Sequence, residues 1–244
     1  MSRDSGTLEV FASPQDVAAA LARLFIDEAH ASLAMRGRFA VSLAGGTTPK
    51  AAYALLAQLP DARALDWNAI DLFFGDERCV PPDHEQSNYR MARLAFLDAL
   101  GIPSARVHRM RGEDDPQAAA RAYRDDLVAA LGTRPRLDLA LLGMGPDGHT
   151  ASLFPGTDPH ADDAALVRAV YAPSQAQWRL TLTPQVLDAA RTVAFTVEGA
   201  AKAAMLKTVR EGPYEPSRFP AQSIAPSDGR LLWLVDRAAA GISA

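Results

Sequence analysis

Short apolar segments alternate along the chain with longer segments whose apolar residues recur at helical spacing. The short segments predict strands, and the run at 137–142 is typical of a strand buried on both faces of a parallel sheet. Strands are expected at residues 8–11, 39–43, 70–74, 137–142, 166–171, 179–182, 193–197 and 231–235. Helices are expected at residues 14–35, from Thr48 onward, and at 88–100, 117–131 and 200–210.

This alternation predicts an α/β fold, a mainly parallel doubly wound sheet with helices on both faces, in a single domain of residues 1–244. Residues 179–182 differ, because Arg179 and Thr181 fall on one face of the strand and two leucines on the other. They fit either a half-exposed strand or a small antiparallel element. The proline-rich stretch 212–226 is expected to be a loop near the ligand site.

The segment L-L-G-M-G-P-D-G-H-T-A-S-L-F-P-G places an acid and a histidine just after the strand at 137–142. Its glycines allow sharp turns and a close approach of the backbone to a ligand. In open α/β sheets, ligands bind beyond the carboxyl ends of the strands. We therefore predict that Asp147 and His149 carry the chemistry. The alternative is a glycine-rich turn with a solvated aspartate and an incidental histidine.

A second strand end, F-A-V-S-L-A-G-G-T-T-P-K, is suited to bind an anion. Thr48 and Pro49 are expected to be the N-cap and first-turn residues of the next helix. Free N–H groups and the helix dipole, together with Gly45, Gly46 and the hydroxyls of Thr47 and Thr48, predict a phosphate or carboxylate site. Nucleotide and dinucleotide spacings are absent, so a small phosphorylated metabolite is expected. The alternative is an ordinary, well-capped turn.

A third strand end, G-D-E-R at residues 75–78, carries three charges. Arg78 is suited to hold an oxyanion or a phosphate through two hydrogen bonds. Asp76 and Glu77 are expected to position a hydroxylated substrate or the arginine. A solvated charged turn is the alternative, for Glu77 in particular.

Composition limits the partners. The chain has 29 acidic and 25 basic residues, a formal net charge of −4, which argues against nucleic acid or an anionic membrane. Cys79 is the only cysteine, so neither a disulfide within the chain nor a multi-cysteine metal site is expected, and it is not expected to be a nucleophile. No histidine pair has metal-ligand spacing, and the other histidines are expected to be structural or solvated. Without a signal sequence or an apolar run of ~20 residues, a cytoplasmic protein is predicted.

In this order and with these gaps, G-G-T-T-P, G-D-E-R-x-V-P-P and G-x-G-x-D-G-H-T-A-S-L-F-P resemble the 6-phosphogluconolactonase family, which is similar in fold to glucosamine-6-phosphate deaminases and sugar-phosphate isomerases. W-R-L-T-L-T-P and E-G-A-A-K extend the likeness over nearly the whole chain. The resemblance implies that His149 is the general base and that Arg179 and Lys202 help to bind the substrate phosphate. It also implies that Asp147 and Arg78 lie in the same pocket.

The resemblance further implies hydrolysis of 6-phospho-D-glucono-1,5-lactone without a cofactor, the lactonase step of the pentose phosphate pathway. His149 would remove a proton from water, and a cation or N–H groups would stabilise the tetrahedral oxyanion. Arg78 is expected to supply that charge or, alternatively, to bind the phosphate. Asp147 is expected either to orient His149 or to bind a sugar hydroxyl.

Phe154 separates this chain from the deaminase branch. The corresponding segment of those enzymes resembles D-G-H-I-A-F-N-E, in which a carboxylate five residues after the histidine assists ring opening. This chain has Phe154 at that position. The missing acid favours lactone hydrolysis over isomerisation. A transcriptional sensor of sugar phosphates is disfavoured, because the sequence has no helix-turn-helix segment and no basic stripe. The oligomeric state is left open.

Overall fold

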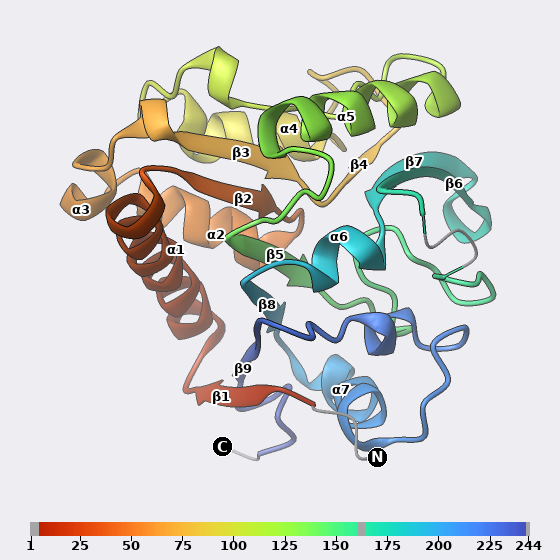
Figure 1. The fold of residues 1–244 in the computed structure, drawn as a ribbon. Coiled ribbons are helices and arrows are strands. Elements are labelled where there is room, and N and C mark those ends of the chain that lie inside the picture. Colours follow the sequence, from red (N-terminus) through yellow and green to blue (C-terminus); the bar gives the residue numbers. More distant parts are fainter. Residues whose placement is uncertain (1–4, 161–163, 243–244) are drawn as a thin grey trace.

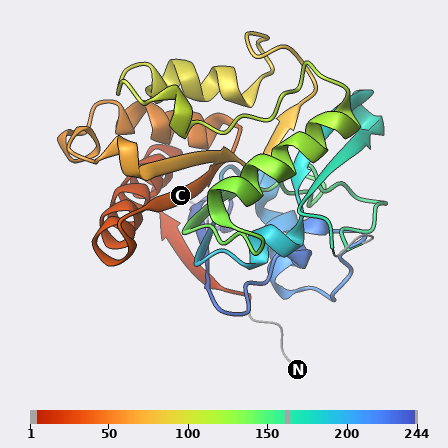
Figure 2. The same cartoon turned by 45° about the horizontal axis from the view of Figure 1, so that its top comes forward.

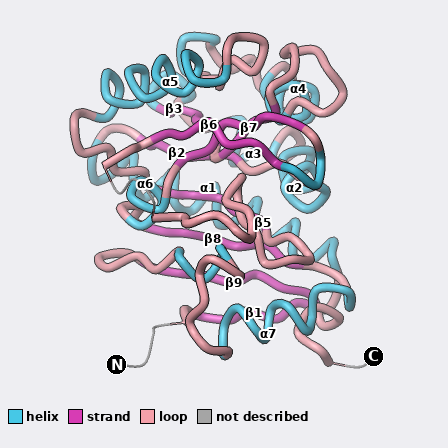
Figure 3. Tube along the Cα trace, turned by 90° about the vertical axis from the view of Figure 1, so that its right-hand side faces the viewer, coloured by secondary structure: helices cyan, strands magenta, loops and turns pink. Residues whose placement is uncertain are grey.

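A six-stranded parallel sheet forms the centre of the molecule (Figure 1). The computed structural model describes residues 5–160 and 164–242. In the order in which they lie, the strands are β1 (Thr7–Phe11), β9 (Arg230–Asp236), β8 (Thr192–Val197), β5 (Leu139–Gly143), β2 (Phe39–Leu43) and β3 (Ile70–Phe74). Figure 3 shows them stacked in this order from bottom to top. Every neighbouring pair is parallel, which confirms the predicted α/β class.

Helices cover both faces of the sheet, as predicted for a doubly wound fold. One face carries α1 (Pro14–Arg36), α2 (Thr47–Leu56) and α4 (Asn88–Ala92), and the other carries α5 (Pro116–Leu131), α6 (Pro184–Asp188) and α7 (Ala203–Glu211). The short α3 (Pro60–Arg63) follows α2. Figure 2 shows α5 in green, crossing its face of the sheet. No helix among residues 5–160 and 164–242 is both long and apolar enough to cross a membrane.

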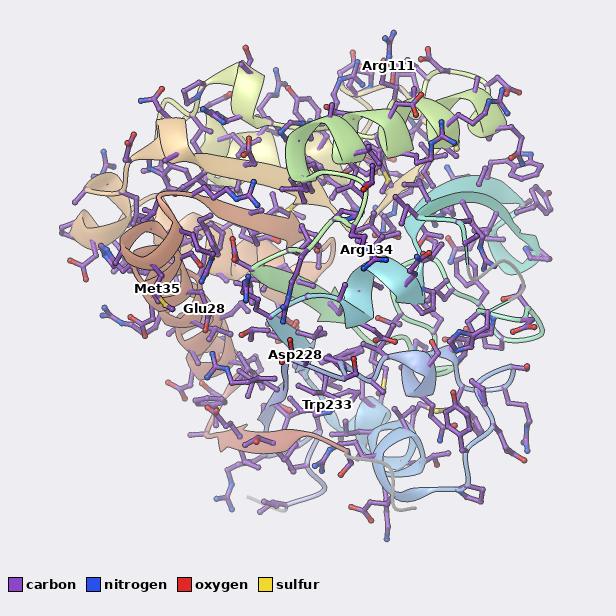
Figure 4. The ribbon with its side chains drawn as sticks, in the orientation of Figure 1. Glu28, Met35, Arg111, Arg134, Asp228 and Trp233 are labelled. Carbon is purple, nitrogen blue, oxygen red and sulfur yellow. The ribbon has the colours of Figure 1, made fainter. Side chains whose placement is uncertain are left out.

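Aromatic pairs contribute to the packing on both faces of the sheet. Phe195 of β8 and Trp233 of β9 stack with ring centroids 4.1 Å apart (Trp233 is labelled in Figure 4). On the opposite face of the sheet, Phe25 of α1 packs edge to face against Phe39 of β2, with ring centroids 5.4 Å apart. The edge-to-face geometry is a favoured one for aromatic pairs, and both pairs bury apolar surface.

A second, antiparallel sheet lies beyond the carboxyl end of β3. Its strands, in order, are β4 (Asp76–Arg78), β7 (Gln177–Leu182) and β6 (Val167–Ala172). This confirms the antiparallel alternative for residues 179–182. Gly75 joins the two sheets, because its N–H donates to the Leu43 carbonyl at 2.9 Å and its carbonyl accepts from the Leu182 N–H at 2.8 Å. The charged residues 76–78 therefore form a strand of their own rather than a turn after β3.

Several helix boundaries differ from the prediction. Gly46, with a φ of 103°, is the N-cap of α2, and Thr48 lies inside the helix. Glycine adopts this left-handed backbone without the steric cost that threonine would meet, so the helix begins earlier than expected. The predicted helix 88–100 is α4 followed by a wider turn, Arg93–Leu97, and a 3₁₀ turn, Ala200–Lys202, precedes α7. The five residues of α6 were missed because so short a helix shows no periodicity.

His108 links three segments beside the edge strand β3. Its Nδ1 lies 3.0 Å from a carboxylate oxygen of Asp126 on α5, and its Nε2 lies 3.1 Å from Asp71 on β3. The ring stacks on Phe73 with centroids 4.3 Å apart. Burial lowers the pKa of His108, but the hydrogen bonds and charges of both carboxylates outweigh it, so this pKa is raised above its ordinary value. The role of this histidine is therefore structural.

We expect the stability that His108 contributes to depend on pH. Because its pKa is raised in the folded protein, this stability is fully present below the unfolded-state pKa of about 6.5 and is lost as pH rises through the folded-state pKa. His108→Gln should lower the free energy of unfolding by about 1.5–3 kcal/mol near pH ~6, the scale of hydrogen bonds to charged groups, and by less near pH ~9. Denaturant titrations measure this, with His30→Gln on an exposed position of α1 as control. An equal loss at both pH values would contradict the expectation.

Candidate active site

A cavity of about 460 Å³ lies at the carboxyl ends of β2, β3, β5 and β8, with β4 and β7 along its side. This is the edge at which open parallel sheets bind their ligands. The predicted site residues that line it are Gly45, Gly46, Thr47, Thr48, Asp76, Arg78, His149, Arg179 and Lys202. Asp147 and Glu77 do not line it, and Asp147 meets the cavity through its contact with His149.

Asp147 and His149 form a hydrogen-bonded pair. His149 Nδ1 lies 2.6 Å from Asp147 Oδ1, and the backbone N–H of His149 donates to the same oxygen at 3.2 Å. A carboxylate can only accept, so Nδ1 carries the proton and Nε2 is left as the basic nitrogen. Burial raises the pKa of Asp147, yet the charge and hydrogen bonds of His149 outweigh it, and this pKa lies below its ordinary value. Asp147 is therefore ionised at neutral pH.

The glycines around this pair permit its close packing. A Cβ at Gly145 would lie 2.1 Å from His149 Nδ1 and 2.6 Å from Asp147 Oδ1, so a larger residue would displace the pair. Gly148 has a φ of 81°, in the left-handed region that favours glycine. The Ala221 N–H donates to the Gly148 carbonyl at 2.9 Å, so the proline-rich stretch supports this turn. The stretch thus lies beside the histidine turn, although none of its residues lines the cavity.

Two arginines face the cavity from neighbouring strands. Arg78 of β4 and Arg179 of β7 are directly opposite in the antiparallel register, so their side chains share one face. Arg78 Nη1 donates to the Gln86 carbonyl, and Arg179 Nη2 donates to Gln175 Oε1. The Nε atoms of both arginines are buried without a hydrogen-bond partner among the described residues. Burial and the charge of Arg78 lower the pKa of Arg179, although the charges of Asp76 and Glu77 act against this shift, so an anion beside Arg179 would favour its charged form.

Lys202 and the start of α2 bring further positive charge to the cavity. Lys202 Nζ donates to the Met144 carbonyl, in the turn that follows β5. Burial lowers the pKa of Lys202, and the negative charges of Asp147 and Glu198 oppose this effect. The first N–H groups of α2 have no partner within the helix, and the helix dipole makes this end attractive to anions. An anion held here would also compensate the buried ammonium.

Glu198 was not predicted as a site residue, although it lines the cavity wall between α2 and β8. Its Oε1 accepts a hydrogen bond from Thr47 Oγ1 at 2.9 Å. The Thr47 hydroxyl therefore faces across the cavity instead of capping its own helix. Glu198 belongs to the E-G-A-A-K segment, but a single glutamate beside a glycine gives no signal of such a contact.

Asp76 is fixed by two neighbours that the sequence also did not single out. Ser152 Oγ donates to Asp76 Oδ2 at 2.7 Å, and Asn88 Nδ2 donates to Oδ1 at 3.1 Å. Ser152 comes three residues after His149, so its bond ties β4 to the histidine turn. Asn88 also fills the space beside Gly45, where a Cβ would lie 2.1 Å from its Oδ1. One indication of these partners was present in the sequence, because Ser152 belongs to the H-T-A-S motif.

Glu77 is buried and does not line the cavity, so the predictions of a substrate-positioning role and of a solvated turn are wrong. The alternative that it positions the arginine fits better, because its Oε1 accepts from the backbone N–H of Arg78 at 2.8 Å. The Glu77 side chain is buried, with the residue 2 % exposed. It accepts from the backbone N–H groups of Asn88 and Tyr89 at 2.7 and 2.8 Å and from Ser87 Oγ at 3.0 Å. Burial raises the pKa of Glu77 and outweighs these hydrogen bonds. Because side chains alternate along a strand, Glu77 lies on the face of β4 opposite the cavity and holds the start of α4.

The remaining chemistry of the site is limited by three observations. In the described parts of the chain, no group of three or more His, Cys, Asp or Glu residues is placed to hold a metal ion. Burial raises the pKa of the Cys79 thiol to about 11, which disfavours a thiolate nucleophile. Phe154 packs against His149 with ring centroids 5.1 Å apart. The cavity can therefore supply a histidine base, oriented by an ionised acid, together with cations for an anionic ligand.

Comparisons with known proteins identify the family of this chain. The chain matches the family described as glucosamine-6-phosphate isomerases/6-phosphogluconolactonase over residues 12–233. A curated 6-phosphogluconolactonase from Synechocystis sp. is 41% identical over 213 residues, which are 85% of this chain and 86% of the relative. The 6-phosphogluconolactonase of Homo sapiens is 39% identical over 240 residues, 96% of this chain and 93% of the relative.

Solved structures give the same result. A structure of 6-phosphogluconolactonase from Trypanosoma cruzi superposes with a TM-score of 0.88 at 29% identity, covering 99% of this chain and 97% of that one. The fold is thus shared over nearly the full length of both chains. The chain belongs to the glucosamine-6-phosphate isomerase/6-phosphogluconolactonase family.

Proposed function

We propose that this protein hydrolyses 6-phospho-D-glucono-1,5-lactone to 6-phospho-D-gluconate, the second step of the oxidative pentose phosphate pathway. The observation that carries the proposal is the Asp147–His149 pair beside three cations in one cavity. Relatives that are named 6-phosphogluconolactonase and align over most of the chain support the same substrate. Water is the only co-reactant, so the reaction needs no cofactor.

In the proposed mechanism, His149 takes a proton from water as the water oxygen attacks the lactone carbonyl. Asp147 holds Nδ1 and stabilises the imidazolium that forms. When the tetrahedral intermediate collapses, the ring C–O bond breaks and the imidazolium returns its proton to the leaving oxygen. Arg78 and Asp76 lie on the same face of β4, and Asp76 accepts a hydrogen bond from Ser152 in the turn that carries His149. Because this places Arg78 on the side of the cavity next to His149, we assign Arg78 to the oxyanion.

Arg179 and Lys202 bind the substrate phosphate in this proposal, together with the N–H groups at the start of α2 and the hydroxyls of residues 47 and 48. Burial lowers the pKa of both cations, so each gains from an anion placed against it. Gly45 and Gly46 leave room for the phosphate beside the backbone. Asp76, held in place by Ser152 and Asn88, is suited to accept a hydrogen bond from a sugar hydroxyl.

Isomerisation or deamination of a sugar phosphate is the competing function on this fold. Such a reaction needs a group that assists ring opening. Phe154 stands where the resemblance to deaminases places a carboxylate, and its ring packs against His149 at 5.1 Å between centroids. A phenyl ring can neither donate nor accept a proton, so this cavity is better suited to hydrolysis.

Product analysis in deuterated water tests the proposal. Attack of water on the lactone leaves the carbon–hydrogen bond beside the carbonyl intact, whereas an enediol mechanism breaks it. We expect the protein to accelerate hydrolysis of 6-phosphogluconolactone above the spontaneous rate, without enzyme-dependent deuterium on carbon. Glucosamine 6-phosphate should release no ammonia. Exchange into carbon, or ammonia release at a rate that rivals lactone hydrolysis, would reject lactone hydrolysis in favour of the isomerase–deaminase chemistry.

A further inference from the structure

Glu198 puts a negative charge beside the groups that are proposed to bind phosphate. The residue directly follows β8, and its Oε1 accepts from Thr47 Oγ1 at 2.9 Å. Thr47 is the first residue of α2, whose free N–H groups form part of the anion site. The Glu198 carboxylate therefore accepts the hydrogen bond that the Thr47 hydroxyl would otherwise donate to a bound phosphate.

The same carboxylate lines the cavity together with Lys202 and acts on it through its charge. Burial lowers the pKa of Lys202, and the charges of Asp147 and Glu198 act against that shift. In the absence of substrate, Glu198 thus offsets part of the cost of burying the ammonium. Glu198 is half-buried and Thr47 is exposed, so packing does not lock their contact in place. A ligand with stronger negative charge is able to displace the carboxylate.

We propose that Glu198 competes with the substrate phosphate for Thr47 and Lys202 and thereby limits the affinity for phosphorylated ligands. This inference rests on the proposed function, in which those two groups contact the phosphate. A phosphate monoester carries a charge of about −1.5 to −2 at neutral pH, so the carboxylate repels it at short range.

Competition between Glu198 and the phosphate would favour product release. The phosphate does not react, so Glu198 weakens the binding of the lactone and of the product alike. Such uniform weakening raises KM without slowing the chemical step. Hydrolysis adds a carboxylate to the product, which makes the product a more highly charged ligand for the cations of the cavity. By limiting the phosphate affinity, Glu198 favours release of that product.

The isosteric substitution Glu198→Gln removes the charge and tests the proposal. Calorimetric titration should give a Kd for 6-phosphogluconate about 5–20-fold lower than that of the wild type, the scale of removing one like charge near the surface. KM for the lactone should fall by a similar factor, and binding of gluconate, which lacks the phosphate, should not tighten. Glu211→Gln is the matched control, because Glu211 is exposed on α7 and does not line the cavity.

A second variant excludes a trivial cause. The glutamine amide could donate a new hydrogen bond to the phosphate, whereas Glu198→Ala offers no donor and should also tighten binding. If both variants bind 6-phosphogluconate as the wild type does, or more weakly, Glu198 supports Thr47 or Lys202 and is not a competitor. A wild-type protein that binds 6-phosphogluconate no better than gluconate would reject the phosphate site itself, and with it both proposals.

Discussion

Replacing His149 by asparagine is expected to lower kcat for the phosphorylated lactone by about 10²–10⁴-fold, the usual contribution of a general base. The variant loses the basic Nε2, but its amide can still donate to Asp147, whose Oδ1 lies 2.6 Å from Nδ1 of the histidine. Affinity for 6-phosphogluconate should change little, because His149 is not one of the groups assigned to the phosphate. The rate is measured after subtraction of spontaneous lactone hydrolysis.

Two further variants distinguish the role of His149 as the base from the role of Asp147 in orienting it. Asp147→Asn keeps the size of the side chain but removes the charge that fixes Nδ1 as the protonated nitrogen, so turnover should fall again without loss of product affinity. His30→Asn replaces an exposed imidazole on α1 and should retain wild-type turnover. Near wild-type turnover of His149→Asn would show that another group, or water alone, serves as the base.

The parallel sheet and the place of the cavity could be predicted because the central strands have no solvent-facing side. β2 is buried at every position, and β5 at every position except its last, so each appears in the sequence as a short apolar run between helical segments. Because the strands are parallel, the glycines that follow them all lie at the carboxyl edge of the sheet. The segments that begin at Gly45, Gly75 and Gly145 could therefore be placed at the same edge of the sheet without knowledge of their side-chain contacts.

Side-chain partners from distant segments could not be predicted in this way. Ser152 and Asp76 are 76 residues apart in the chain, and only the folded sheet brings them within 2.7 Å. Glu77 is a charged residue next to a turn, and its burial depends on the backbone of α4 folding over it. Thr48 suits an N-cap by residue type, but the backbone of Gly46 starts the helix earlier. In each case a contact or a backbone conformation overrides the local preference.

Arg179→Met and Lys202→Met are expected to weaken the binding of 6-phosphogluconate by about 1.5–3 kcal/mol each, the scale of a hydrogen bond to a charged group. Methionine keeps an apolar stem of similar length but removes the charge. The loss should be much smaller for gluconate, because only the phosphate is assigned to these cations. Folding stability should not fall in Arg179→Met, since burial and Arg78 lower the pKa of Arg179 and so disfavour its charge in the folded protein.

Calorimetric titration of both ligands, with unfolding curves of the same preparations, tests these expectations. Arg134→Met and Lys207→Met are matched controls, because both residues are exposed and neither lines the cavity (Arg134 is labelled in Figure 4). Equal losses for gluconate and 6-phosphogluconate would place the two cations away from the phosphate. A large fall in stability of Arg179→Met would mean that Gln175 and other neighbours already compensate its charge. A phosphate-specific loss at unchanged stability of Arg179→Met is the result expected if these cations serve the ligand rather than the fold.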